Sequence, residues 1–302
     1  MKNDGYTYHD RITSAEAGET LGGFYSRRYP HSSEEEWRGH VEAGRVRRNG
    51  VTETDPDSVL RAGDRLEWRR PAWEEEDVPT DIPALAQTAG WMVLAKPSGI
   101  PVLPGGGFLR NTMLWIVRER HGALLAPVHR LGRGTSGAIL FSRTTDAARA
   151  LGRGMREGEI RKTYLALVQG LPAEDRFTID MPIGPVPYAP LGMLHAASLV
   201  GKPSVSHCHV LRRNAERDQA LLEVDIPTGR PHQIRIHCAV AGHPLVGDPL
   251  YRAGGLPIDS NAVPGDCGYF LHSWQIRFPD PASGETVHVV APPPEILKPD
   301  SQ

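Results

Sequence analysis

Two segments of the chain, about a hundred residues apart, hold most of the side chains that could do chemistry. The first reads VHRLGRGTSGAILFSR (residues 128–143) and the second reads TGRPHQIRIHCAVAGHPLVGDPLY (residues 228–251). The run from Gly134 to Ala138 comes near the G-x-S-x-G turn that presents the nucleophile of serine hydrolases. The final glycine of that turn is absent, no strand pattern leads into it, and no aspartate–histidine pair follows. A hydrolase site is therefore not indicated.

The cysteine and histidine pattern does not predict a metal site. Cys208, Cys238 and Cys267 are widely spaced and form no C-x-x-C pair. His207 and His209 flank Cys208, but neighbouring residues on a strand point to opposite faces, so the three could not bind one ion together. We expect neither a bound metal nor a disulfide framework.

The two segments resemble the motifs of the RluA-like RNA pseudouridine synthases. That family reads HRLDxxTSG, followed about a hundred residues later by GRxHQIRxH and GxPIxGDxxY. Two further stretches fit: Lys96-Pro97 matches the family's KPxG, and LHSWQIRFPDP (residues 271–281) matches its late LHA-x-x-L-x-F-x-H-P. The resemblance covers Ala84–Pro294 and implies site-specific isomerisation of a uridine in structured RNA, ribosomal or transfer, with no cofactor and no metal.

The resemblance also assigns roles to individual side chains. The reaction breaks the glycosidic carbon–nitrogen bond, turns the uracil and joins it to the same sugar through carbon, after the base has left its stack. Tyr164 in RKTYLALV matches the tyrosine that packs against the target uracil. Arg235 in HQIRIH matches the arginine that pairs with the catalytic carboxylate. Arg130 in HRLG matches the arginine that inserts where the flipped base was.

One position departs from the family pattern, because Gly132 stands where the family has its catalytic aspartate. Glycine supplies no acid, and acid–base assistance is commonly worth ~10²–10⁴-fold in rate. Three hypotheses remain open. Another carboxylate (Asp146, Asp225 or Asp248) reaches the same spot; the protein binds RNA without isomerising it; or the reaction follows a different route. Asp248 is expected to hold its own turn instead.

An N-terminal stretch resembles the small RNA-binding module first described in ribosomal protein S-four. A helix capped by Ser32 or Ser33 precedes VEAGRVRRNG and AGDRLEW, which follow the module's I-x-x-G-x-V-x-V-N-G and G-D-x-[ILV] patterns. The resemblance places four arginines on the RNA-facing side: Arg38, Arg45, Arg47 and Arg48. The alternative is a solvated basic edge without a ligand.

The order of the expected elements predicts four regions and an α+β fold. We predict a mobile start (residues 1–18), the small RNA-binding module (19–70), an acidic, Pro-punctuated linker (71–83) and a catalytic domain (84–302). In the catalytic domain, helices over Thr112–His121 and Thr144–Met155 interrupt a mostly antiparallel series of strands.

The composition is typical of a globular protein, and its net charge is compatible with RNA binding through local patches of basic residues. The chain has 302 residues, 39% hydrophobic and 23% charged, with a formal net charge of −2. Lys and Arg together number 34, and most are Arg, which pairs with phosphate and stacks on bases. No apolar run is long enough to span a bilayer and no signal peptide is evident. We expect a cytoplasmic protein, and no heptad or apolar stripe predicts an obligate dimer, so we expect a monomer.

Overall fold

The computed structural model describes residues 1–29 and 32–299, and the chain divides into two compact units. One unit comprises Met1–Glu75 with the short segment Pro190–Gly192, and the other comprises Glu76–Ala189 and Met193–Gln302. The boundary falls inside the segment predicted as a linker. Residues 75–83 hold no helix or strand, as their prolines and acidic residues favour.

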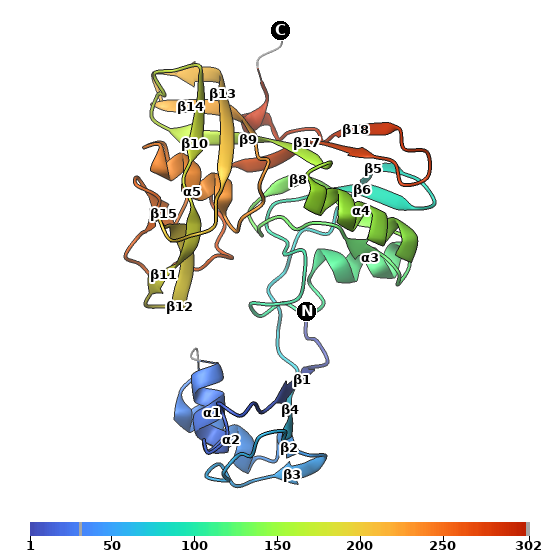
Figure 1. The fold of residues 1–302 in the computed structure, drawn as a ribbon, viewed down its shortest axis with the longest axis vertical. Helices are drawn as coiled ribbons and strands as arrows, with labels where there is room; N and C mark the ends of the chain where they lie inside the picture. The colour runs from blue at the N-terminus through green and yellow to red at the C-terminus, as the bar shows by residue number, and fades with distance from the viewer. Residues whose placement is uncertain (30–31, 300–302) are drawn as a thin grey trace. The chain divides into compact units, whose positions relative to one another are not determined.

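The small unit is a four-stranded antiparallel sheet, in the order β1-β4-β2-β3, with two helices (Figure 1). Its elements are β1 (Tyr6–Arg11), α1 (Leu21–Arg28), α2 (Glu34–Glu42), β2 (Val46–Arg48), β3 (Val51–Glu53) and β4 (Arg65–Arg70). Helix α2 begins at a capping box in which Ser33 and Glu36 bond each other's backbone. Trp37 and Val41 of α2 are fully buried against Val46 and Leu66 of the sheet.

The predicted mobile start is wrong, because residues 6–11 form β1 and pair with β4 along its whole length. Although this segment is mostly polar, two of its apolar side chains pack into the small unit. The ring of Tyr8 stacks on Trp68 with centroids 5.0 Å apart, and Ile12 is buried in the core. Asn3 is buried too, and its amide donates to the carboxylate of Glu75. The small unit therefore includes residues ahead of position 19, where the predicted module was expected to begin.

The large unit is built on a ten-stranded sheet, and the α+β prediction is confirmed. The main path runs β10-β13-β14-β9-β17-β8-β6-β5, with β18 paired to β17 and β7 to β8. Among the described residues its pairs are antiparallel, except the parallel pair β17·β8.

The strands of this sheet are β5 (Ala84–Gln87), β6 (Trp91–Lys96), β7 (Ala126–Pro127), β8 (Ser136–Ser142), β9 (Arg161–Gln169), β10 (Arg176–Asp180), β13 (Val205–Asn214), β14 (Gln219–Asp225), β17 (Leu271–Pro279) and β18 (Thr286–Val290). Two small hairpins add β11 (Ile183–Tyr188) with β12 (Gly192–Ala197) and β15 (Tyr251–Arg252) with β16 (Leu256–Pro257). The helices are α3 (Met113–His121), α4 (Thr145–Glu157), α5 (Gln233–Val240) and a 3₁₀ turn, η1 (Glu295–Leu297).

Helices cover both faces of the large sheet, as the unbroken apolar run of β6 requires, because its successive side chains point to opposite faces. On β6, Met92 and Leu94 join the core that contains α3 and α5, while Trp91 and Val93 join the core beneath α4. Figure 1 shows α3 and α4 at the half formed by β5, β6 and β8, and α5 at the half formed by β10, β13 and β14. The turn that carries Gly132 leads into β8, and Tyr164 lies on β9.

Candidate active site

A cavity of about 90 Å³ brings together the residues that the motifs predicted. Gly132 from the turn before β8, Tyr164 from β9 and Arg235 from α5 all line it, with Arg130 and Tyr269. A water molecule in the liquid takes up ~30 Å³, so this cavity alone has room for a few waters. It adjoins a second cavity of about 390 Å³, and both are lined by Arg130, Tyr164, Ile226 and Arg230.

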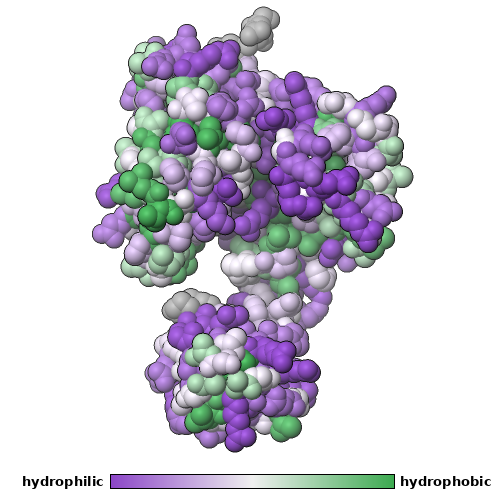
Figure 2. Space-filling model, in the orientation of Figure 1, coloured by the Kyte–Doolittle hydropathy of each residue, from purple (hydrophilic) through white to green (hydrophobic). Residues whose placement is uncertain are grey.

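Basic side chains continue along the surface from these two cavities. A third cavity, of about 560 Å³, shares Lys162 with the second and is also lined by Arg161 and Arg277. Helix α4 exposes Arg149, Arg153 and Arg156, and Figure 2 shows hydrophilic residues gathered over this helix. An anionic ligand several units long would meet positive charge along this path.

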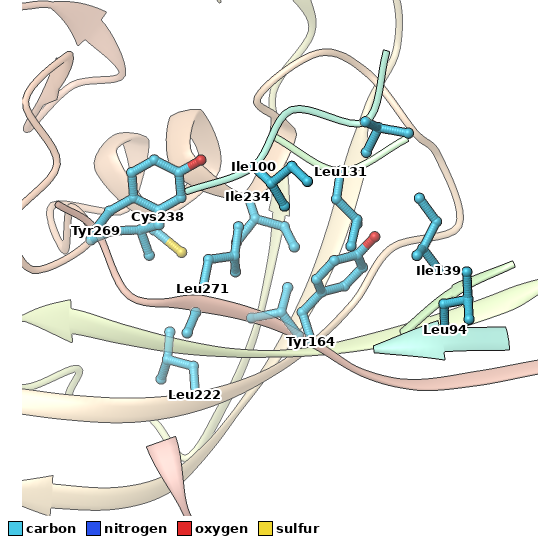
Figure 3. Packing of buried hydrophobic residues seen from close by; sticks show 14 of the residues in the cluster. Leu94, Ile100, Leu131, Ile139, Tyr164, Leu222, Ile234, Cys238, Tyr269 and Leu271 are labelled. Atoms are coloured by element: carbon cyan, nitrogen blue, oxygen red, sulfur yellow. The ribbon is translucent and has the colours of Figure 1, made fainter. Parts of the chain in front are cut away.

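Tyr164 is held as a protonated phenol among apolar neighbours. The residue is 5% exposed, and Figure 3 shows its ring beneath the side chain of Leu131, with Ile234 and Leu271 between it and Tyr269. Burial raises the pKa of Tyr164 to about 12. The ring can therefore pack against a planar base without carrying charge.

Arg235 is fixed by a buried, two-fold hydrogen bond to Asp248. Its Nε and Nη2 donate to Asp248 Oδ2 and Oδ1, each at 2.7 Å, and the two side chains are 2% and 1% exposed. Asp248 Oδ1 also accepts from the backbone N–H of Leu250 and Tyr251, so it holds its turn as expected. Within residues 1–29 and 32–299, the third guanidinium nitrogen, Nη1, is buried without a hydrogen-bond partner.

Two histidines at the rim are neutral and serve as hydrogen-bonding groups. Burial, followed by the nearby charge of Arg235, lowers the pKa of His232 to about 3. Burial lowers the pKa of His129 to about 3 as well. His129 Nε2 accepts from the backbone N–H of Leu140, which leaves the proton on Nδ1. That Nδ1 finds no partner among the described residues.

Neither Asp146 nor Asp225 takes the place of the missing carboxylate. Asp146 is an exposed side chain paired with Arg149 on α4. Asp225 accepts from the hydroxyl of Thr163 at 2.6 Å and lines the 560 Å³ cavity. Asp248 reaches Arg235, but among the described residues no Asp or Glu lines the 90 Å³ cavity. The groups around Gly132 are hydrogen-bond donors and apolar surfaces.

Comparison with known proteins agrees with this architecture. Residues 90–240 match the family model described as RNA pseudouridylate synthase. An uncharacterised RNA pseudouridine synthase of Synechocystis is 42% identical over 280 residues, which are 92% of this chain and 95% of the relative. The chain belongs to the RNA pseudouridine synthases. It is accordingly an isomerase that acts on uridine in RNA.

Two further relatives of this synthase extend the comparison. A ribosomal large subunit pseudouridine synthase D of Nitrosomonas europaea is 34% identical over 229 residues, 74% of this chain and 64% of that protein. The structure of human RNA pseudouridylate synthase domain containing 1 aligns with a TM-score of 0.58 at 26% identity. That alignment covers 72% of this chain and 86% of the human one.

The predicted arginines of the small unit differ in how far they are already paired. Arg48 donates to Asp64 and Ser58 and is largely buried, so its donors are occupied. Arg38 forms a two-fold, exposed pair with Asp57. Arg45 contacts the ring of His40, and Arg47 lies on β2 opposite Glu67. The Arg48 guanidinium is thus tied into the small unit by these bonds.

The strand register reveals a basic sheet face that the motifs did not identify. It is formed by Arg11, Arg47, Arg65 and Arg69, which share the face turned away from Leu66 and Trp68. One acid, Glu67, lies on the same face opposite Arg47. Arg11 and Arg65 are directly opposite each other on β1 and β4, and both are exposed. Alternation along β4 was the available signal, but it predicted this face only once β1 was known to be a strand.

Lys96 is a buried residue beside the site to which the motifs assigned no role. Its ammonium is buried and donates to the carbonyl oxygens of Pro97, Arg133 and Thr135, at 3.0, 2.9 and 2.8 Å. Two of these carbonyls belong to the turn that follows Gly132. Lys96 therefore fixes the shape of the turn at the site.

Proposed function

We propose that this synthase isomerises one uridine in a structured RNA, ribosomal or transfer, and that Tyr164 and Arg235 act at the flipped base. The observation that supports this most strongly is that Gly132, Tyr164 and Arg235, from three separate motifs, line one cavity with Arg130. The adjoining 390 Å³ cavity lies in the size range of small-ligand sites, ~300–1,000 Å³. Together the two cavities offer room for a base and its sugar.

In this proposal each side chain has a separate task. Tyr164 packs against the uracil through its neutral ring. Arg130, which is exposed at the rim, enters the RNA where the base has left. Arg235 keeps one donor, Nη1, for the target nucleotide, because its other donors hold Asp248. A base that is unpaired or mismatched costs least to extrude, which favours a loop or a bulge as the target.

The small unit is proposed to bind the same RNA through its basic sheet face. Like charges directly opposite each other on paired strands destabilise a sheet, so Arg11 and Arg65 would gain from a bound anion. A phosphate between them supplies that anion. Arg45, directly before β2, is proposed to extend this face beside Arg47. Arg38 must give up Asp57 before it can contact RNA.

The name of the Nitrosomonas relative favours ribosomal RNA as the first substrate to test. RNA from a strain that lacks the protein should gain a pseudouridine when incubated with it, detected by carbodiimide-stop sequencing of ribosomal and transfer RNA. Tyr164→Phe and Arg235→Lys proteins should restore the mark poorly, while Tyr188→Phe, a buried tyrosine of the β11–β12 hairpin, should restore it fully. Unmodified RNA in every fraction would leave the alternative, a binding protein derived from such an enzyme.

We place the protein in the cytoplasm as a monomer, where it would meet ribosomal and transfer RNA. Within the part of the chain that the structure describes, no helix is long and apolar enough to cross a bilayer. Gel filtration of the purified protein with light scattering would test the monomer, whose mass is 33.1 kDa.

A further inference from the structure

Tyr269 occupies the space that a side chain at position 132 would need. A Cβ atom built on Gly132 would lie 2.9 Å from the Tyr269 hydroxyl oxygen and 3.4 Å from Thr135 Oγ1. A Cβ on Gly134 would lie 2.9 Å from Cζ of the same tyrosine. Both glycines therefore make room for one phenol ring, and the missing carboxylate and this tyrosine exclude each other.

The hydroxyl of Tyr269 lies among groups that suit a reacting phenol. Its oxygen is 3.3 Å from the hydroxyl of Thr135, and the residue lines the same cavity as Tyr164. The guanidinium carbon of Arg235 lies 4.2 Å from the centre of the Tyr269 ring. Figure 3 shows Tyr269 and Tyr164 on the same side of the sheet, separated by Ile234 and Leu271.

The cavity beside Gly132 carries a positive charge, from Arg235, where a site with the family's aspartate would also carry a negative one. Arg235 keeps the buried donor Nη1 without a partner in the described chain, and no acid of that part lines the cavity. Burial raises the pKa of Tyr269, so the phenol begins the reaction protonated, while the nearby Arg235 guanidinium opposes that rise and favours the phenolate. A proton can thus leave the phenol and return to it.

We propose that Tyr269 replaces the absent carboxylate: its hydroxyl contacts the target uridine and exchanges a proton with the base during isomerisation. This inference rests on the proposed function, because it concerns the same cavity and the same flipped nucleotide. It adds a catalytic residue that lies outside the motifs and explains how glycine can stand at position 132 in an active enzyme.

The proposed step conserves protons and electrons. As the bond between ribose C1′ and uracil N1 breaks, its electron pair moves onto the uracil ring and O2 takes the proton of the Tyr269 hydroxyl. The products are a ribosyl cation, neutral uracil and a phenolate held beside Arg235. After the ring turns, C5 bonds to C1′ and loses its proton to the phenolate. The phenol is restored, the proton on O2 moves to N1, and no oxidant, reductant or co-reactant is consumed.

The test compares wild type, Tyr269→Phe and a matched control, Tyr188→Phe. Phenylalanine keeps the ring between Gly132 and Gly134 and removes only the hydroxyl. The Tyr188 hydroxyl donates to the backbone carbonyls of Ser260 and Ala262, and this residue does not line the site. We expect kcat of Tyr269→Phe to fall ~10²–10⁴-fold, with RNA affinity and thermal midpoint unchanged, because general acid–base groups contribute about that factor. The control should match wild type.

A second measurement separates a proton-exchanging phenol from a packing residue. Replacement of Tyr269 by 3-fluorotyrosine keeps the shape of the ring and makes the phenol more acidic. The alkaline limb of the kcat–pH profile should then move to lower pH, which a merely structural ring would not cause. This measurement also covers the case in which Tyr269→Phe folds poorly.

The outcomes distinguish the inference from the proposed function beneath it. If wild type modifies RNA and kcat of Tyr269→Phe lies within about threefold of the wild-type value, the role of Tyr269 is overturned and the proposed function stands. Equal losses of RNA affinity and kcat, with an unmoved pH profile in the fluorinated protein, would overturn it too. Wild type that modifies no RNA would remove the proposed function and this inference together.

Discussion

Arg38 in the small unit and Arg235 in the large unit form the same kind of ion pair in opposite surroundings. Each donates two hydrogen bonds to one aspartate, Arg38 to Asp57 at 2.7 and 2.8 Å and Arg235 to Asp248 at 2.7 Å twice. The side chains of the first pair are 38% and 63% exposed, and those of the second are 2% and 1% exposed. Geometry alone therefore does not separate them.

Burial decides what each pair can do. An exposed guanidinium is screened by water and salt, so its aspartate can be exchanged for a phosphate at little cost. A buried one has lost its water, and removal of its partner leaves an uncompensated charge. The exposed pair of the small unit thus carries a charge that an anion can exchange, as RNA binding in the proposed function requires. The buried pair holds its charge in one fixed position beside the cavity.

The largest expected effect breaks the buried pair. Asp248→Ala leaves the Arg235 guanidinium buried without its anion. We expect the free energy of unfolding to fall by ~3–5 kcal/mol and activity to be lost. Asp57→Ala is the matched control in the exposed pair, and its free energy of unfolding should equal that of wild type within error. Urea unfolding measures both. Equal losses in the two variants would show that burial does not separate the pairs.

A second prediction concerns the exclusion between position 132 and Tyr269. Gly132→Asp forces a Cβ against the Tyr269 hydroxyl, and overpacking of this kind costs ~1–3 kcal/mol. The double variant Gly132→Asp/Tyr269→Phe removes the contacting oxygen and should recover most of that loss. Calorimetry would show the non-additivity expected of touching residues. If Gly132→Asp alone is as stable as wild type, the two side chains do not compete for space.

A third prediction uses the buried ammonium that shapes the turn beside Gly132. Burial lowers the pKa of Lys96 to about 7, while in the unfolded chain it titrates near 10.5. Between these values the unfolded chain binds the additional proton, so this residue makes stability rise with pH, by about 1.4 kcal/mol per unit. Lys96→Met should remove that rise. Urea unfolding of both proteins at several pH values from 7 to 10 measures the difference in slope; parallel curves would contradict it.

The sequence allowed the residues of the site to be predicted more fully than their partners. Motif order indicated that Gly132, Tyr164 and Arg235 would meet, and the structure brings them to one cavity. The motifs did not identify Tyr269. This residue lies just before β17 and contacts the turn before β8, a contact between distant segments that the spacing within either segment does not predict. For Arg235 the sequence left three candidate carboxylates, Asp146, Asp225 and Asp248, and only the fold selects Asp248 as its partner.

The small unit shows the same limit for a different reason. Its helix α2, with its capping box, and its turns were legible from local chemistry, which acts over a few residues. Strand β1 could not be predicted from its polar residues, because it is stabilised by pairing with β4 and by stacking on Trp68, which lie far along the chain. The ion pair of Arg48 with Asp64 was not legible either, because it depends on the register of the sheet. The contact of Arg48 with RNA stays a prediction.

The smallest expected effect lies on the basic sheet face. Arg47→Gln and Arg65→Gln should each weaken RNA binding only a few-fold at moderate salt while leaving kcat unchanged, because a phosphate contact is electrostatic and lies outside the pocket. Each loss should lower the slope of log affinity against log salt by about 0.7–0.9, the value for one released counterion. Filter binding across a salt series measures it. Arg27→Gln, on α1 and paired with Glu19, is the control and should keep the wild-type slope. If all three variants share that slope, the sheet face does not contact phosphate, and the exposed charges of the small unit serve its solubility alone.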